Sequence, residues 1–306
     1  MMLFKIYGLG RSIYRLHNWR EAHRFVVFIG RALINYSAVK RMYNWFVEEE
    51  QRRQILEGNA FLIEQATRAF FYKGSTFSER ENLICSHIGF LQKRLKQDWG
   101  YRLAIHYARY TIWQSQEEDL NWQAQLTMEP GQRKEGLLSV MMLLNNRPLY
   151  QIIFWFNENQ KKEESLWIGA MQGPNMEDAK EIIKEITKRS YRYRTKNLIL
   201  YMTMAVARAF KVKHIYAVSN NGYYAMNHVR RDRKLKTDFG AFWEEVGGRL
   251  TDDERFYEIP LVEPRKSMEE VPTRKRAVYR KRFAFQDDVD AQIAENLRKI
   301  MSVEED

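Results

Sequence analysis

Residues 137–171 have the sequence LLSVMMLLNNRPLYQIIFWFNENQKKEESLWIGAM. Two apolar runs, 137–144 and 149–156, are joined by a polar segment that begins Asn145-Asn146, and a third run covers 166–171. Apolar runs on either side of a short polar turn predict a β-hairpin. Runs as apolar as these are typical of strands at the centre of a sheet that is covered on both faces. We therefore expect three neighbouring strands to form the core of the fold.

The segments around this stretch alternate between helical and strand patterns. Apolar residues recur at helical spacing through residues 1–117, and we expect Asn175 to cap a helix that carries Ile182 and Ile186. The remaining elements are a half-buried strand at 122–128, a buried helix at 198–210, strands at 215–219 and 256–262, and an amphipathic helix at 288–300.

This order predicts an α+β protein, in which a helical N-terminal region is followed by a mixed, mostly antiparallel sheet with covering helices. We place the boundaries at residues 1–117 for the helical region, 118–287 for the α/β sheet domain, and 288–306 for the C-terminal helix and tail. A chain of 306 residues is long enough for one large domain or two ordinary ones.

The balance of charge favours anionic partners. Lys and Arg number 50 against 39 Asp and Glu, a formal net charge of +11. Such a field attracts nucleic acid, phospholipid headgroups or a phosphorylated cofactor without choosing among them. Since no nucleic-acid-binding motif is visible, we expect no sequence-specific recognition of nucleic acid.

The cysteine and histidine content argues against a metal site. Cys85 is the single cysteine, which rules out an intrachain disulfide and a cysteine-based zinc site. None of the six histidines pairs at HxxxH or HExxH spacing. We therefore expect no bound metal.

The first residues do not form a secretory signal, because Lys5, Arg11 and Arg15 interrupt their apolar residues. A membrane span needs about twenty apolar residues, and the longest stretch nearby is shorter and contains Arg31. We expect the protein in the cytoplasm, either free or peripheral on the inner membrane. The mixture of aromatic and basic residues up to Arg20 fits docking at a membrane interface, but the pattern favours the alternative, a helix packed on its own domain.

Two further basic clusters are present, at residues 230–236 and 274–282. Aromatic residues, among them Tyr279 and Phe283, interleave with the second cluster. Such clusters can bind phosphate groups or an anionic membrane surface, or they can be solvated faces.

Three stretches resemble the VirK/YbjX family of Gram-negative bacteria. They are WIGAMQGPN at 167–175, YRYRTKNLILYMTMAVARAFKVKHIYAVSN at 191–220 and DFGAFWEEVGG at 238–248. The resemblance implies a role in cell-envelope maintenance and virulence, including resistance to cationic antimicrobial peptides. No catalytic residues come with it.

The strand meander followed by a helix and a strand also resembles the acyl-CoA N-acyltransferase fold, in which a helix N-terminus holds the cofactor pyrophosphate. That likeness assigns phosphate binding to Arg192, Arg194 and Lys196, the cofactor arm to Asn220, and protonation of the leaving thiolate to Tyr224 as catalytic residue. The glycine-rich signature of that fold is missing, and two helices stand where it has one. The alternative is a solvated charge run followed by a turn with packed tyrosines.

Two function hypotheses follow. The first is an acyl-CoA-dependent acyltransferase, with acyl-CoA as the cofactor that it requires. The second is a non-catalytic basic adaptor that binds anionic lipid or a partner protein. A pocket between the strand ending at Met171 and the strand ending at Ser219 would indicate the enzyme, whereas a filled core there would indicate the adaptor.

Overall fold

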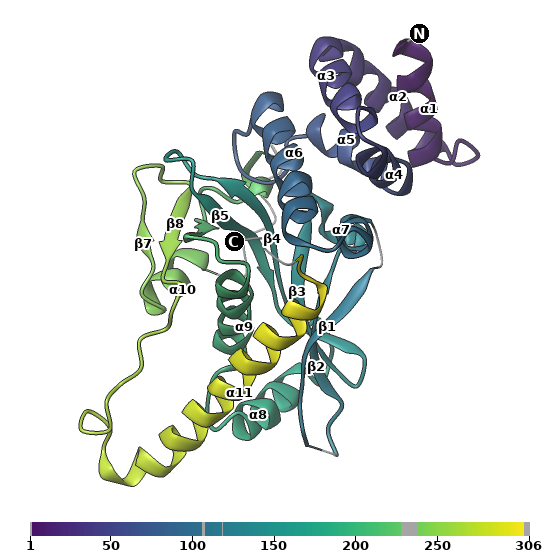
Figure 1. Ribbon diagram of the computed structural model, residues 1–306. Coiled ribbons are helices and arrows are strands. Elements are labelled where there is room, and N and C mark those ends of the chain that lie inside the picture. Colours follow the sequence, from purple (N-terminus) through teal and green to yellow (C-terminus); the bar gives the residue numbers. More distant parts are fainter. Residues whose placement is uncertain (1, 106–107, 118, 228–237, 303–306) are drawn as a thin grey trace.

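The computed structural model describes residues 2–105, 108–117, 119–227 and 238–302 (Figure 1). The N-terminal part is helical and leads into the sheet through α6 and α7. Its helices are α1 (Met2–Ile13), α2 (Trp19–Ile34), α3 (Tyr36–Val47), α4 (Glu50–Gly58), α5 (Phe61–Ala66), α6 (Phe77–Arg94) and α7 (Gln97–Ala104).

A single eight-stranded sheet follows, with the strand order β1-β2-β3-β4-β5-β6-β8-β7. Only β5 and β6 pair in parallel, and the other neighbours are antiparallel. The strands are β1 (Arg109–Gln114), β2 (Trp122–Thr127), β3 (Leu138–Leu144), β4 (Arg147–Glu158), β5 (Glu164–Gln172), β6 (His214–Val218), β7 (Arg249–Leu250) and β8 (Phe256–Ile259). The predicted mixed, mostly antiparallel α+β fold is confirmed.

The hairpin predicted from residues 137–156 is confirmed and lies in the middle of the sheet as β3 and β4. Its turn residues Asn145 and Asn146 both have positive φ, 49° and 61°. A two-residue turn with this backbone matches the twist of the strands that it joins, and asparagine tolerates it better than most residues.

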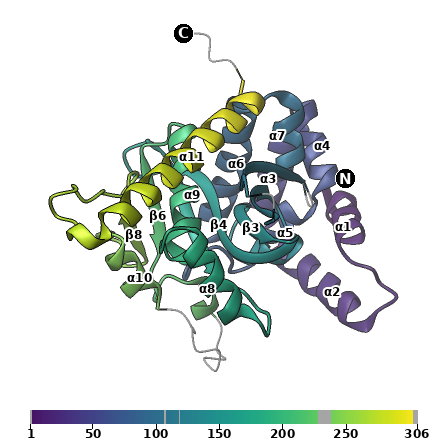
Figure 2. The ribbon, with the colours of Figure 1, turned by 90° about the horizontal axis from the view of Figure 1, so that it is seen from below.

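The helices of the C-terminal part are α8 (Ala179–Arg189), α9 (Thr195–Ala209), α10 (Phe239–Glu245) and α11 (Arg276–Ile300), with short 3-10 turns η1 (Pro130–Lys134), η2 (Tyr224–Asn227) and η3 (Thr273–Lys275). Helix α11 packs on α9 and β1, and Figure 2 shows it crossing α9.

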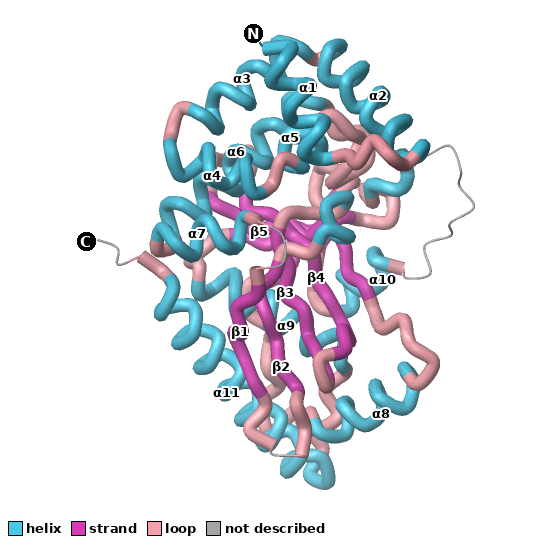
Figure 3. The backbone as a smooth tube through the Cα atoms, turned by 90° about the vertical axis from the view of Figure 1, so that its right-hand side faces the viewer, coloured by secondary structure: helices cyan, strands magenta, loops and turns pink. Residues whose placement is uncertain are grey.

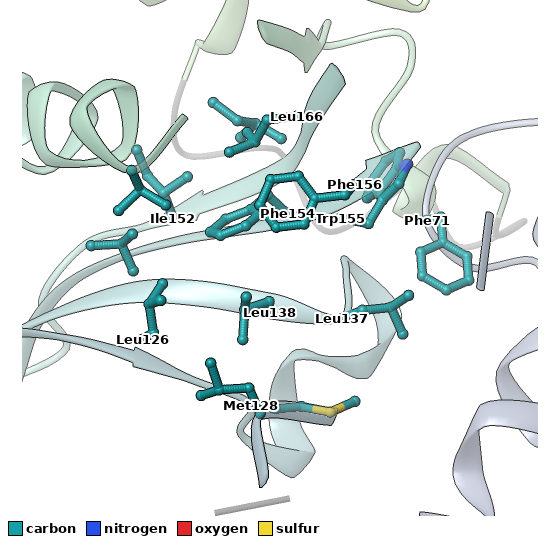
Figure 4. Close-up of a cluster of buried hydrophobic side chains, with 14 of the residues drawn as sticks. Phe71, Leu126, Met128, Leu137, Leu138, Ile152, Phe154, Trp155, Phe156 and Leu166 are labelled. Atoms are coloured by element: carbon teal, nitrogen blue, oxygen red, sulfur yellow. The ribbon is translucent and has the colours of Figure 1, made fainter. Parts of the chain in front are cut away.

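One face of the sheet is apolar across its width and is covered by helices; we call it the helix-covered face. Leu126, Leu138, Ile152, Phe154 and Leu166 lie together on it (Figure 4). Phe90 of α6 and Phe210 after α9 both contact Phe156 there, and Phe285 of α11 contacts Trp113 and Trp122, which follow this face through β1 and β2.

Irregular segments, rather than helices, shield the opposite face. Gln151 donates hydrogen bonds to Gln132 of η1 (2.7 Å) and to Ser139 (2.8 Å). Tyr72, in the segment before α6, stacks on Trp155. Figure 3 shows α9 behind β1–β4 from this side. The expectation that both faces of the central strands are covered therefore holds, but with loops on one side.

Three predicted elements differ from the structure. Strand β1 lies inside the region expected to be helical. The sequence did not reveal it because a bulge between Thr111 and Trp113 leaves Ile112 and Trp113 both buried, which hides the alternation typical of a strand. Helix α11 begins at Arg276 instead of residue 288. The prediction began too late because the first turns of the helix are rich in basic residues, which conceal its apolar periodicity. Helix α8 begins after Asp178, so Asn175 is not its cap. The three-part division at 117 and 287 stays a prediction.

The N-terminal helices pack mainly on one another. Helix α1 contacts α2, α2 contacts α3, and α3 contacts α4, α5 and α6. The hydroxyl of Tyr14, just after α1, donates to Glu64 of α5 (2.8 Å), a carboxylate that is 1% exposed and also pairs with Arg68. None of the described helices is long and apolar enough to cross a bilayer.

Gly169 tests the packing at the centre of the sheet. It lies at a bulge of β5, and a Cβ there would stand 1.8 Å from the carbonyl oxygen of Glu135. We expect Gly169→Ala to lower the free energy of unfolding by about 3 kcal/mol, because backbone blocks the added methyl. Gly131→Ala, which meets nothing within 4 Å, is the control in denaturant titration. Equal stability of the two variants would contradict this packing.

Candidate functional site

The predicted phosphate-binding residues lie at the turn between α8 and α9. Tyr191 and Arg192 have positive φ, 54° and 62°, and Arg282 of α11 donates hydrogen bonds to both of their carbonyl oxygens. The side chain of Arg192 is exposed. This turn brings the chain into α9 at Arg194, the N-cap residue.

Arg194 and Lys196 come together, but on a carboxylate. The Arg194 guanidinium pairs with one oxygen of Glu245, at the end of α10, and Lys196 Nζ lies 3.4 Å from the other. Lys196 also lies over the ring of Phe242, 4.3 Å from its centroid. An anionic ligand at this position would have to compete with Glu245, whose single carboxylate already offsets one of the two positive charges.

Asn220 and Tyr224 make structural contacts. The side chain of Asn220 accepts from the N–H of Phe239 and donates to Asp238, both at 2.7 Å, so it holds the first turn of α10. Tyr224 is buried, and its ring contacts Phe70 and Tyr223.

The gap between the ends of β5 and β6 is filled. The parallel pairing of β5 with β6 runs from Ser165–His214 to Ile168–Ala217. Beyond this point β5 continues to Gln172 paired with β4 only. The backbone of Glu135 lies against Gly169, and the backbone of Arg255 lies 2.1 Å from where a Gly222 Cβ would stand. The four principal cavities formed by the described residues have volumes of 230–630 Å³, and neither Met171 nor Ser219 lines any of them.

A polar cluster that sequence reasoning missed closes this gap. Glu135 is 6% exposed and accepts hydrogen bonds from the hydroxyl of Tyr223 and from Gln172 Nε2, the latter at 2.6 Å. Burial raises the pKa of the Glu135 carboxyl, and it also raises the pKa of Tyr223. The cluster joins the start of β3, the end of β5 and the loop after β6. In the sequence, only a carboxylate directly before an apolar strand hinted at it.

The helical end of the molecule carries an unusual set of exposed apolar side chains. Eight of the eleven large apolar residues that are exposed in the described chain lie within the first 36 residues. They are Leu3, Phe4, Tyr7, Trp19, Val26, Leu33, Ile34 and Tyr36. Phe4, Trp19 and Ile34 are 82%, 83% and 84% exposed. Exposed apolar residues gathered in one part of a chain in this way are typical of an interaction surface.

Helix α2 is apolar on two opposite sides. Phe28 and Ala32 face the neighbouring helices, while Trp19, Val26 and Leu33 recur every seven residues on the outward side. Tyr7 of α1 contacts Phe25 of α2 edge to face, which joins the exposed residues of the two helices.

Positive charge accompanies these apolar residues. Residues 1–47 contain eight Lys and Arg against one Glu, a net charge of +7 out of +11 for the whole chain. Arg20, Arg24 and Arg31 follow the outward side of α2 along one flank, and Arg24 pairs with the single acidic residue, Glu21. We call the eight exposed apolar residues, with these three arginines, the N-terminal surface.

The basic cluster at 274–282 keeps Arg274, Lys275, Arg280 and Lys281 exposed, but none of its large apolar residues is exposed. Within 274–282, Arg282 is occupied by the carbonyl groups before α9 and by the ring of Tyr279 (4.5 Å to its centroid). Phe283, beside that cluster, lies under Arg265. The cluster at 230–236 lies outside the described residues.

The fold and its surfaces define a mixed α+β protein. The gap between the ends of β5 and β6 is filled, and the helical end carries exposed apolar and basic residues. The chain belongs to the VirK/YbjX family: the family model described as "Protein of unknown function (DUF535)" matches residues 17–295.

Proteins similar to this chain include two that are described as uncharacterized. The chain is 34% identical over 178 residues to the uncharacterized protein YbjX of Escherichia coli strain K12; the match covers 57% of this chain and spans about half (53%) of that protein. It is 23% identical over 273 residues to an uncharacterized protein of Haemophilus influenzae strain Rd, with 87% of each chain covered. No solved structure matches the fold.

Glu135 provides a test of the buried cluster by pH. Its pKa is raised in the folded protein, so above the ordinary value of 4.5 the unfolded chain loses this proton first, and the free energy of unfolding falls as pH rises toward the raised pKa. Glu135→Gln removes this titration. We expect the stability of the variant relative to the wild type to increase with pH over this window, by an amount on the order of 1 kcal/mol.

Denaturant titrations at a series of pH values measure this difference, with Glu177→Gln at an exposed position as the control. A relative stability of Glu135→Gln that stays constant with pH would show that the carboxyl is not protonated preferentially in the folded state.

Proposed function

We propose that this protein is a non-catalytic adaptor that binds anionic lipid at the cytoplasmic face of the inner membrane through its N-terminal surface. The observation that carries the proposal is the coincidence of two independent features in one short region. Most of the exposed large apolar residues and a net charge of +7 both occur within the first 47 residues. An interfacial helix needs this combination, since neither charge nor apolar area alone holds a protein firmly at a bilayer.

The expected energies are sufficient for reversible binding. Burying a Trp, Phe or Ile side chain is worth roughly 1.5–3 kcal/mol, and each Lys or Arg near an anionic surface adds about 1 kcal/mol. Partial insertion of Phe4, Trp19 and Ile34, together with the flanking arginines, therefore offsets the cost of association. Because the helices are already folded, little ordering is required on binding.

The family resemblance supplies the physiological setting of the proposal. It associates such proteins with envelope maintenance, virulence and resistance to cationic antimicrobial peptides. A basic protein on the inner leaflet could serve such a process by recruiting or positioning other components at the membrane, with no reaction of its own.

The acyltransferase hypothesis has less support. Its phosphate-binding candidates Arg194 and Lys196 are paired with Glu245, and its cofactor-arm candidate Asn220 holds α10. The cavity of about 300 Å³ nearest to them is lined by three carboxylates, Glu244, Glu245 and Glu263. A cavity with that lining disfavours the pyrophosphate of acyl-CoA.

Vesicle co-sedimentation tests the adaptor. We expect wild-type protein to bind vesicles containing phosphatidylglycerol, to bind phosphatidylcholine vesicles weakly, and to bind less as salt rises. The double variant Trp19→Ser, Ile34→Ser should bind at least about tenfold more weakly, because two inserted side chains are lost.

The matched control is Leu250→Ser, Val262→Ser, which removes two exposed apolar residues from the sheet domain. Equal loss of binding in both double variants, or tight binding of the wild type to neutral vesicles, would refute the proposed surface.

A thermal-shift titration separates the two hypotheses. A ligand that binds only the folded state raises the apparent melting temperature. We expect acyl-CoA to leave the melting temperature of the wild type unchanged, or to change it equally in the wild type and in the double variant Arg194→Gln, Lys196→Gln. If acyl-CoA stabilises the wild type and fails to stabilise Arg194→Gln, Lys196→Gln, the enzyme hypothesis replaces the adaptor.

A further inference from the structure

The largest principal cavity of the described residues lies among the N-terminal helices α1, α3 and α4, away from the sheet. Its volume is about 630 Å³, within the range of small-molecule sites. Its lining comprises Lys5, Gly8, Leu9, Ser12, Tyr43, Val47, Arg53, Leu56, Glu57 and Ala60. The geometry points to a binding site for a phosphate-bearing lipid, whose acyl chain occupies this cavity. The inference deepens the proposed function and rests on it.

The apolar part of the lining suits a hydrocarbon chain. Leu9, Val47 and Leu56 come from three different helices and meet at the cavity, together with Ala60 from the turn between α4 and α5. Gly8 also lines the cavity, and it leaves space there: a Cβ at this position would meet no atom within 4 Å. A glycine in the middle of an α-helix costs stability relative to other residues, and here it keeps the cavity wide.

One cation at the cavity, Lys5, suits a phosphate. Lys5 Nζ lies 4.5 Å from the centroid of the Tyr43 ring, which holds its ammonium group in place without neutralising it. Arg53 also lines the cavity, but its charge is already paired with Glu50 at 2.8 Å, and it donates to the Val47 carbonyl at 2.9 Å. Glu57 also lines the cavity, so a second negative charge on the headgroup is disfavoured.

The cavity adjoins the N-terminal surface through α1 itself. Phe4 and Tyr7, which belong to that surface, alternate along the helix with Lys5 and Gly8, which line the cavity. A lipid in the membrane beneath the N-terminal surface would therefore reach the cavity over a short distance. The apolar lining that suits the acyl chain and the cation that suits the phosphate therefore lie at the same place.

Isothermal titration calorimetry with monomeric lysophosphatidylglycerol, below its critical micelle concentration, tests this site on the full-length protein. Gly8→Leu fills the cavity, and each displaced methylene of the ligand weakens binding roughly fourfold. We expect at least about tenfold weaker binding by Gly8→Leu. Loss of folding is not a concern, because leucine favours helix more than glycine does.

The matched control is Gly89→Leu in α6, where a Cβ likewise meets nothing within 4 Å and no principal cavity is lined. This variant should bind as the wild type does. Lys5→Gln should weaken binding of lysophosphatidylglycerol but change little in the binding of an alkyl maltoside with the same chain, which has no phosphate. No binding by the wild type, or equal binding by Gly8→Leu and Gly89→Leu, would overturn the inference.

Failure of this site and failure of the proposed function are distinguishable. Trp19→Ser, Ile34→Ser should lose vesicle binding yet retain monomeric lysophosphatidylglycerol, because neither residue lines the cavity. Gly8→Leu should retain vesicle binding and lose binding of monomeric lysophosphatidylglycerol. Loss of monomer binding in the Trp19, Ile34 variant would overturn the assignment of the lipid to the cavity, whatever the vesicles show.

Discussion

Burial of the helix-covered face of the sheet is the constraint on which the rest of the structure depends. That face is apolar from Trp113 and Trp122 at one edge to Ile259 at the other, and large side chains such as Phe154 and Phe156 are fully buried on it. Helices α6, α9 and α11 cover this face, with α9 at the centre and α11 crossing it (Figure 1). Each large side chain removed from water contributes roughly 1.5–3 kcal/mol, so covering this face is a major source of the stability of the fold.

The same constraint explains why the two ends of the molecule differ. Because α6, α9 and α11 cover the sheet, α1 and α2 have no sheet to cover, and they pack on neighbouring helices with one side each. Their outward sides keep Phe4, Trp19 and Ile34 exposed. At the sheet, in contrast, the strand ends where a cofactor would be expected are closed by the Glu135 cluster and by backbone packed against Gly169 and Gly222. The surface that we propose for lipid binding is therefore at the helical end.

The sequence predicted the regular elements well where periodicity was strong. The hairpin of β3 and β4, the apolar helix α9 and the mixed sheet all follow from patterns between residues 137 and 219. Predictions were wrong where local rules break: a bulge concealed β1, and basic residues concealed the first turns of α11. Candidate sites were harder to predict. Charge in the sequence identified Arg194 and Lys196, but their partner Glu245 is 49 residues or more away, and only folding reveals the pair. The composition of the first segment indicated an interfacial helix as one alternative, but the exposure of Ile34 could not be predicted, since an apolar helix residue usually faces a core.

Hydrogen–deuterium exchange of the full-length protein, with and without vesicles containing phosphatidylglycerol, tests the central claim most directly. The account predicts that vesicles slow amide exchange in α1 and α2 and leave the segment from Tyr191 to Tyr224 unchanged. Protection that appears at Tyr191–Tyr224, with none in α1 and α2, would place the lipid-responsive site at the strand ends and contradict the account.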